Sequence, residues 1–173
     1  NTNAPDTSDT VKSSVTFDLS STGTDIELTK VENLTLTGTG AIDGTGNAEN
    51  NAIVGNTGAN KIDGKGGDDA MTGGIGNDTY TVDSTSDTVT ETSAATTEID
   101  TIKSSVSFDL ATKGINVENL ELLTGATDGT GNAFNNKITG NAVANTMDGG
   151  IGNDTMTGGD GDDAYKVDSA SDV

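Results

Sequence analysis

The residues most able to do chemistry are Asn and Asp side chains that recur nine positions apart. Counted in blocks of nine that each begin with glycine, the sixth residue is Asn or Asp throughout residues 46–81 and 131–166. These sixth residues are Asn51, Asn60, Asp69 and Asp78, then Asn136, Asn145, Asp154 and Asp163, and, one block further in each frame, Asp87 and Asp172. Carboxylate, amide and backbone carbonyl oxygens are the hard ligands that Ca²⁺ accepts in flexible geometry, whereas Mg²⁺ requires a stricter octahedron. The spacing therefore indicates rows of calcium-binding side chains.

The composition excludes most other site chemistries. The chain of 173 residues contains no histidine and no cysteine, so zinc, copper, haem and iron–sulfur sites lack their usual ligands. Ser-His-Asp and Cys-His catalysis are excluded for the same reason. With 28 acidic and 8 basic residues, the net charge of −20 disfavours nucleic acid and anionic lipid surfaces as partners. No apolar run approaches the roughly 18 residues of a membrane-spanning helix, and no signal peptide is evident, so we expect no membrane insertion.

Each block of nine also predicts its own local structure. One apolar residue per block, at the eighth position, is too sparse for an amphipathic helix, and the glycines favour sharp turns. A short strand that alternates polar and apolar residues fits the last three positions. The inward-pointing residues would be Ile53, Ile62, Met71, Tyr80, Ile138, Met147, Met156 and Tyr165. Stacked blocks would form a parallel β-solenoid with carboxylates in rows about 5 Å apart, a repulsion that a divalent cation would offset.

A longer repeat divides the chain into two units, residues 1–83 and 84–173. The stretch DTVKSSVTFDL at 9–19 returns as DTIKSSVSFDL at 100–110. The predicted parts of the two units are spacer strands at 9–42 and 99–125 and nonapeptide clusters at 46–81 and 131–166. Because the second copy stops where the first runs on, we expect an internal fragment of a longer array.

The spacers have a strand-like pattern of their own. Apolar and polar residues alternate in three stretches: Val15, Phe17 and Leu19; Leu34 and Leu36; and Val106, Phe108 and Leu110. We expect these stretches to form strands that continue the stack. The segment at 84–98, STSDTVTETSAATTE, is expected to be a loop, with a flexible polar linker as the alternative.

Three blocks resemble the GGxGxDxUx nonapeptide of the RTX (repeats-in-toxin, haemolysin-type) calcium-binding proteins, where U is a large apolar residue: GGIGNDTYT at 73–81, GGIGNDTMT at 149–157 and GGDGDDAYK at 158–166. The block at 64–72 departs from this pattern, with Lys65 in place of the second glycine. The resemblance implies an all-β, right-handed parallel β-roll, a β-solenoid in which two nonapeptides make one coil. It also implies that Ca²⁺ is the cofactor and lies between turns 18 residues apart.

The same resemblance assigns side-chain ligands to the sixth positions and carbonyl ligands to the glycine turns. The side chains would act in pairs: Asn51 with Asp69, Asn60 with Asp78, Asp69 with Asp87, Asn136 with Asp154, Asn145 with Asp163, and Asp154 with Asp172. The glycines would be Gly64, Gly67, Gly73, Gly74, Gly76, Gly149, Gly150, Gly152, Gly158, Gly159 and Gly161. Asn offers an oxygen without charge, so calcium sites at the Asn turns are expected to be weaker or absent, with stacked Asn side chains in their place.

These features predict a calcium-binding structural β-roll module of a large, repetitive bacterial protein that is secreted or displayed on the cell surface, such as an adhesin, a surface layer or a fibre. The resemblance implies that it folds on binding calcium, after export by type I secretion. Calcium ions are the expected partners, with end-to-end self-association through sheet edges as a second expectation. The alternative is a C-terminal calcium-folding and secretion module of a type I-secreted protease, lipase or alginate epimerase.

Catalysis by the chain itself is a third alternative. The acid pairs Asp68–Asp69 and Asp162–Asp163 have the composition of a general acid–base pair. They fall on the nine-residue frame, however, and neither a lysine cluster nor an aromatic platform for a sugar accompanies them. We therefore expect no enzymatic activity and assign no catalytic residues.

Overall fold

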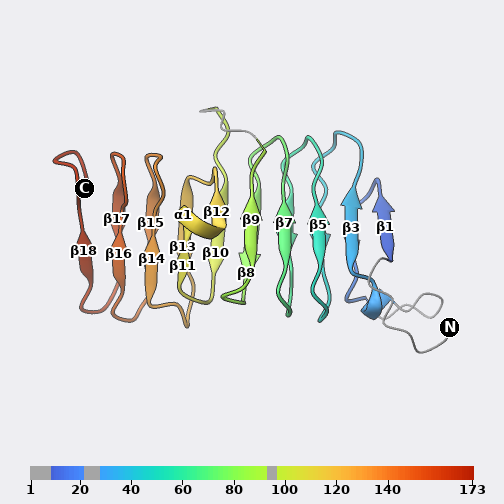
Figure 1. Ribbon diagram of the computed structural model, residues 1–173, viewed down its shortest axis with the longest axis horizontal. Coiled ribbons are helices and arrows are strands. Elements are labelled where there is room, and N and C mark those ends of the chain that lie inside the picture. Colours follow the sequence, from blue (N-terminus) through green and yellow to red (C-terminus); the bar gives the residue numbers. More distant parts are fainter. Residues whose placement is uncertain (1–8, 22–27, 93–96) are drawn as a thin grey trace.

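The computed structural model describes residues 9–21, 28–92 and 97–173. In this part of the chain the strands follow one another along an elongated solenoid, with β1 near one end and β18 at the other (Figure 1). All of the strand pairs there are parallel, as stacking of successive coils requires. The predicted parallel β-roll, in which the spacers continue the stack, is confirmed.

Three sheets are formed by the described residues. The first contains β1 (Thr10–Ser13), β3 (Asn33–Leu36), β5 (Ala52–Val54), β7 (Ala70–Thr72), β9 (Thr88–Thr90) and β12 (Gly114–Ile115). The second contains β2 (Phe17–Asp18), β4 (Gly44–Thr45), β6 (Lys61–Asp63), β8 (Thr79–Val82), β10 (Thr101–Ser104), β13 (Asn119–Leu122), β15 (Lys137–Thr139) and β17 (Thr155–Thr157). The third contains β11 (Phe108–Asp109), β14 (Asp128–Thr130), β16 (Thr146–Asp148) and β18 (Ala164–Lys166). From β1 to β10, and again from β13 to β18, successive strands alternate between the second sheet and one of the other two.

The core consists of inward side chains stacked in register, one above another. In the first sheet the row is Leu34, Ile53, Met71 and Val89. In the second sheet it is Ile62, Tyr80, Ile102, Leu120, Ile138 and Met156. Burying each such side chain contributes roughly 1.5–3 kcal/mol. Tyr165, the predicted inward residue of β18, is half exposed because β18 is an edge strand with a neighbour on one side.

The prediction of a loop at 84–98 is wrong for its first part. Residues Thr88–Thr90 form β9, which pairs with β7 and places Val89 fully in the core. The apolar eighth position therefore continues the stack even though the glycines of the repeat are missing there. Residues 93–96 of the predicted loop lie outside the described part of the chain.

The prediction of strands around Val15 and Val106 is wrong for these two residues. Val15 is 62% exposed and lies in a bend after β1, and Val106 lies in the corresponding bend after β10. A serine explains both bends. The hydroxyl of Ser13 or Ser104 donates to the carbonyl two residues on, at 2.7 Å in each case, and accepts from the N–H of that same residue. This local pairing competes with continuation of the strand.

Among the described residues, two short helices interrupt the strands: η1 (Leu28–Lys30) and α1 (Leu110–Lys113). The strand predicted through Leu110 ends instead at Asp109, whose carboxylate accepts a hydrogen bond from the N–H of Ala111 at 2.8 Å and caps α1. Leu110 is nevertheless fully buried, as the alternation predicts. No helix within the described ranges is long and apolar enough to cross a membrane.

The second repeat unit is out of step with the first by half a coil. The first-unit strands β1 and β3 lie in the first sheet, whereas their second-unit counterparts β10 and β13 lie in the second sheet. Strand β10 pairs with β8, which places Ile102 opposite Tyr80. One sheet therefore runs without a break from the first nonapeptide cluster into the spacer that follows it.

Candidate metal centres

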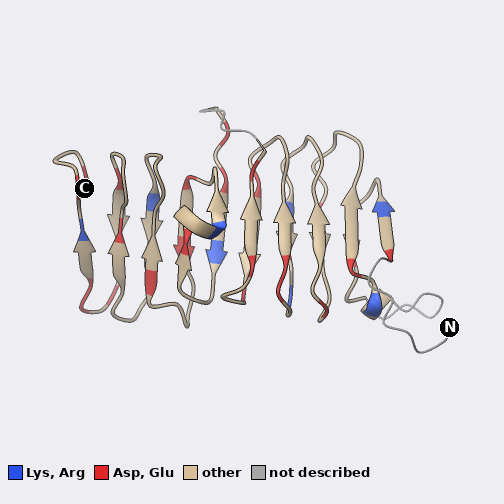
Figure 2. Ribbon diagram, viewed as in Figure 1, with Lys and Arg blue, Asp and Glu red and all other residues tan. Residues whose placement is uncertain are grey.

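A ladder of hydrogen bonds joins the sixth-position residues of successive coils. In each step, the backbone N–H of one residue donates to the side-chain Oδ1 of the residue 18 positions on. The six steps are Asn51 to Asp69 (2.7 Å), Asn60 to Asp78 (2.6 Å), Asp69 to Asp87 (2.8 Å), Asn136 to Asp154 (2.8 Å), Asn145 to Asp163 (2.9 Å) and Asp154 to Asp172 (3.0 Å). The structure thus brings all six predicted pairs together, along a solenoid whose length is lined with acidic residues (Figure 2).

Three of these aspartates carry a second oxygen with no partner. The Oδ2 atoms of Asp69, Asp78 and Asp154 are buried and accept no hydrogen bond from the described residues. Each of these side chains is at most 2% exposed. A buried carboxylate oxygen is costly unless a donor or an opposite charge meets it. The donor set therefore fits a hard cation such as Ca²⁺.

Burial controls the protonation of these carboxyls. It raises the pKa of Asp69 from 3.8 to about 7, with the neighbouring charge of Asp87 adding to the effect. Burial also raises the pKa of Asp78 from 3.8 to about 6, and it raises the pKa of Asp154. In all three residues the hydrogen bond from the preceding coil opposes this shift. Without a cation, the folded chain therefore disfavours these three negative charges.

The ladder ends differently at Asp87 and Asp172. The Oδ2 of Asp87 accepts hydrogen bonds from the backbone N–H groups of residues 83 and 84, and Asp172 repeats this arrangement with residues 168 and 169. Hydrogen bonds from the backbone lower the pKa of Asp172. Both oxygens of each carboxylate therefore have donors from the protein. Asp163 is partly exposed, unlike its buried first-unit counterpart Asp78.

The predicted glycine positions lie where a side chain would collide with the turn. At the first position of the Asp blocks, a Cβ would overlap the carboxylate of the sixth residue; this holds for Gly64, Gly73, Gly149 and Gly158. At the second and fourth positions the glycines have positive φ and lie against the backbone of the preceding coil: Gly67, Gly74, Gly76, Gly150, Gly152, Gly159 and Gly161. Close stacking of the turns therefore requires glycine at all of these places.

The turns with Asn at the sixth position differ from the Asp turns in their hydrogen bonds. In the turn before β5, the Asn51 Oδ1 accepts from the N–H of Asn47 at 2.7 Å, and its Nδ2 donates to the carbonyls of Val31 (3.0 Å) and Glu32 (3.3 Å). The Asn47 Nδ2 donates to the same Val31 carbonyl and to that of Leu28, both at 2.8 Å. Side-chain amides therefore satisfy the carbonyls of the preceding coil.

The same amide arrangement recurs in the other three Asn turns. The Asn pairs are Asn56 with Asn60, Asn132 with Asn136, and Asn141 with Asn145. In each turn, both Nδ2 groups donate to carbonyls of the coil before. A cation would have to displace these N–H donors from the oxygens it needs, so the four Asn turns do not fit a calcium site as the Asp turns do.

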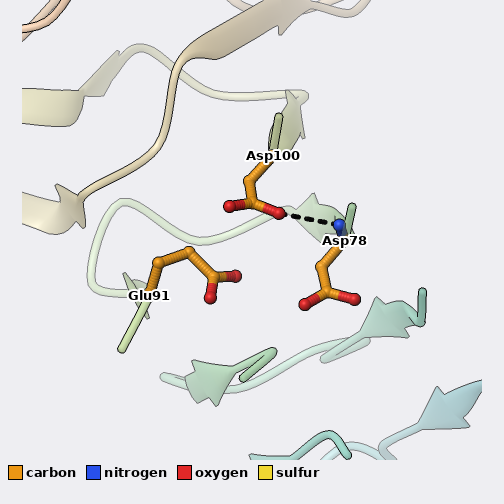
Figure 3. A group of neighbouring side chains, drawn as sticks. All are labelled: Asp78, Glu91 and Asp100. Atoms are coloured by element: carbon orange, nitrogen blue, oxygen red, sulfur yellow. Dashed lines mark hydrogen bonds between the residues drawn. The ribbon is translucent and has the colours of Figure 1, made fainter. Parts of the chain in front are cut away.

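A further acidic group lies where the first cluster meets the next spacer. Asp78, Glu91 and Asp100 each offer an oxygen within 4.8 Å of those of the other two, and all three residues are buried (Figure 3). Burial raises the pKa of Glu91 from 4.5 to about 8 and the pKa of Asp100 from 3.8 to about 7. The nine-residue frame predicts neither Glu91 nor Asp100. The only signal for Asp100 is the stretch Asp100-Thr101-Ile102, which repeats the order of Asp78-Thr79-Tyr80 before β8.

Comparison with protein families agrees with this geometry. The family model described as RTX calcium-binding nonapeptide repeat (4 copies) matches residues 45–80 and 130–165. These ranges contain every Asp turn with an unpartnered Oδ2. A search of the curated proteins gave no match to the chain. The matched ranges are therefore RTX repeats, and this chain is a calcium-binding β-roll in which two RTX clusters are joined by a spacer of the same solenoid.

Proposed function

We propose that the chain is a structural module that folds into its solenoid on binding calcium, within a large secreted protein of the adhesin, surface-layer or fibre type. The observation that carries this proposal is the set of three buried, unpartnered Oδ2 atoms, on Asp69, Asp78 and Asp154. When bound, calcium supplies the positive charge that these turns lack. The sixth-position aspartates and the carbonyls of the glycine turns are the proposed ligands.

The chain's own residues prepare these turns in two steps. Glycines let each turn approach the preceding coil, and the ladder hydrogen bond then fixes the Oδ1 of each aspartate. The Oδ2 is left facing the first glycine of its own block. Because the row of single core side chains is thin, repulsion among the carboxylates is large relative to the hydrophobic stabilisation. Folding is therefore coupled to metal binding.

Circular dichroism in chelator, then in calcium, then in magnesium tests this coupling. We expect most of the β signal to appear on addition of calcium, with magnesium much less effective at the same concentration. A chain with its full β signal in chelator, unchanged by calcium, would contradict the proposal.

The type of parent protein is proposed from the repeat of the whole unit. The second unit continues the same sheet as the first, so the solenoid can be extended by adding units. We propose the division into units at residues 83 and 84, secretion by the type I route, and end-to-end association through the exposed edges of β1 and β18. Sequence adjoining the chain tests the parent: further units support a structural protein, whereas an upstream protease, lipase or epimerase domain favours the appendage of a secreted enzyme.

A further inference from the structure

The acidic group at the end of the first cluster consists of three side chains that each lie next to the end of a different strand. Asp78 immediately precedes β8, Glu91 immediately follows β9, and Asp100 immediately precedes β10. Figure 3 shows the three carboxylates converging on one region between these strands. The exposed fractions are 1% for Asp78 and 2% for each of the other two. Glu91 and Asp100 lie between the two nonapeptide clusters, outside the ranges matched by the RTX family model.

Hydrogen bonds from the protein hold this group in place. The Asp100 Oδ1 accepts from the Asp78 N–H at 2.7 Å, which extends the ladder by one step into the spacer. Glu91 accepts from the hydroxyl of Tyr80 through Oε1 and from the N–H of Gly74, at 3.3 Å, through Oε2. These donors are neutral, so they orient the carboxylates without cancelling their charge.

The described residues place no ion-pair partner beside these carboxylates. None of the ion pairs within the described residues involves Asp78, Glu91 or Asp100. The Asp78 Oδ2 is buried and accepts no hydrogen bond there. A Cβ at Gly73 would overlap this oxygen and the Tyr80 hydroxyl and would approach Glu91 Oε1 to 2.6 Å. The absence of a side chain at residue 73 therefore leaves the two carboxylate oxygens facing the same small space.

We propose that the calcium ion at the Asp78 turn is held by Asp78, Glu91 and Asp100 together, in a site built jointly by the last nonapeptide turn and the segment that follows it. This inference rests on the proposed calcium-binding function and adds two ligands that the repeat does not supply. Three carboxylates within reach of one another are a suitable donor set for a hard divalent cation. The site would join β8 to β10, and so couple the folding of the first cluster to that of the second unit.

Tyrosine-sensitised terbium luminescence tests the site directly, because Tyr80 donates to one of the proposed ligands. The chain has two tyrosines, so Tyr165→Phe leaves Tyr80 as the single sensitiser. In this background we expect strong terbium emission that calcium displaces. Adding Glu91→Gln should weaken the Tyr80-reported affinity at least about tenfold. Equilibrium dialysis should show one fewer bound calcium.

Glu49→Gln is the matched control, since it removes the same charge from an exposed turn. It should leave both the emission and the calcium count unchanged. Asp100→Asn, which keeps an oxygen for the Asp78 N–H, is the second variant if Glu91→Gln does not recover the β signal in calcium. Equal binding by Glu91→Gln and Glu49→Gln would overturn the proposed site, as would absence of calcium-displaceable emission in Tyr165→Phe alone. Failure of the proposed calcium-dependent folding can be told apart from failure of this site. In that case the chain without substitutions would show no calcium-dependent β signal.

Discussion

The turns before β5 and β7 occupy the same place in consecutive coils, yet the side chains at their sixth positions make different hydrogen bonds. In the turn before β5, the N–H of Asn47 donates to the sixth-position Asn51, whose amide donates onward to the coil before. In the turn before β7, the corresponding N–H, that of Lys65, donates to Asp63 at 3.0 Å, and the Asp69 Oδ2 has no donor. The same change is found between Asn136 and Asp154 in the second cluster. Each cluster therefore begins with two turns closed by amides, and the Asp turns that follow leave a buried, unpartnered Oδ2 on Asp69, Asp78 and Asp154.

The largest expected effect separates these two kinds of turn when calcium is removed. In chelator, we expect amide hydrogen exchange to reach the unfolded rate in β7 and β17, which follow Asp turns. Strands β5 and β15, which follow Asn turns, should keep about tenfold protection, equivalent to about 1.4 kcal/mol. Exchange measured by mass spectrometry on peptides from each strand checks this. Uniform loss of protection in all four strands would remove the distinction between the turns.

The next effect is on calcium affinity. Asp154→Ala should raise the calcium concentration at the folding midpoint at least about tenfold, because a charged ligand is lost. Asp78→Ala and Asp163→Ala should shift the midpoint in the same direction. Asn136→Ala, the matched change one coil earlier, should lower stability without a specific change in calcium affinity. Because lower stability alone also raises the folding midpoint, equilibrium dialysis at saturating calcium distinguishes these outcomes: Asp154→Ala should bind one calcium ion fewer, and Asn136→Ala should bind as many as the unaltered chain. An unshifted midpoint in Asp154→Ala would argue against its role as a ligand.

Replacing Asn by Asp, or Asp by Asn, at a sixth position should change the stability of the calcium-free chain in opposite directions. Asn51→Asp places a carboxylate against the carbonyls of Val31 and Glu32 and removes one of the donors to each, which should cost about 1–3 kcal/mol. Asp69→Asn removes a buried charge and should stabilise the calcium-free chain while raising its calcium requirement. Circular dichroism in chelator at increasing concentrations of sucrose, which favours the folded state, measures both. Equal destabilisation by the two changes would show that side-chain charge is not what distinguishes the turns.

A pH effect of opposite sign to ordinary acid denaturation is expected in chelator. The folded-state pKa values of Asp69, about 7, and Asp78, about 6, lie above the ordinary value of 3.8. The folded chain therefore binds more protons than the unfolded chain between these limits, and its stability falls as the pH rises through this window. The β signal measured by circular dichroism in chelator should be higher near pH 5 than near pH 8, and Asp69→Asn should reduce the difference. With calcium present the trend should reverse, because protons compete with the cation.

The smallest expected effect concerns the one departure from the glycine pattern in the Asp turns. Lys65 adopts a φ of 62°, where other Asp turns have Gly74, Gly150 or Gly159. Lys65→Gly should relieve this backbone strain, while losing the exposed ion pair with Asp63 at 2.9 Å. We expect a net stabilisation of about 1 kcal/mol or less in calcium, measured by thermal unfolding. Lys61→Gly, within strand β6, should instead destabilise.

Features that depend on the nine-residue period could be predicted from the sequence. The nine-residue spacing predicts which residues point inward, such as Ile53, Met71 and Val89. The pairing of Asn51 with Asp69, 18 residues on, is implied by the resemblance to the RTX repeat. The spacers have no such period. Their local hydrogen bonds, such as that from Ser13 to the Val15 carbonyl, decide where strands end, and chain closure decides that Glu91 meets Asp78. These contacts have no fixed sequence separation from which they could be read.

The passage of the second sheet from β8 into β10 has a consequence for any partner that recognises the spacers. Equivalent spacer strands of the two units, β1 and β10, belong to opposite sheets. A molecule that docks on the outer side of one spacer would find its counterpart on the reverse side of the rod. A ligand that bound both spacers through the same strands would therefore have to reach around the solenoid rather than along one face of it.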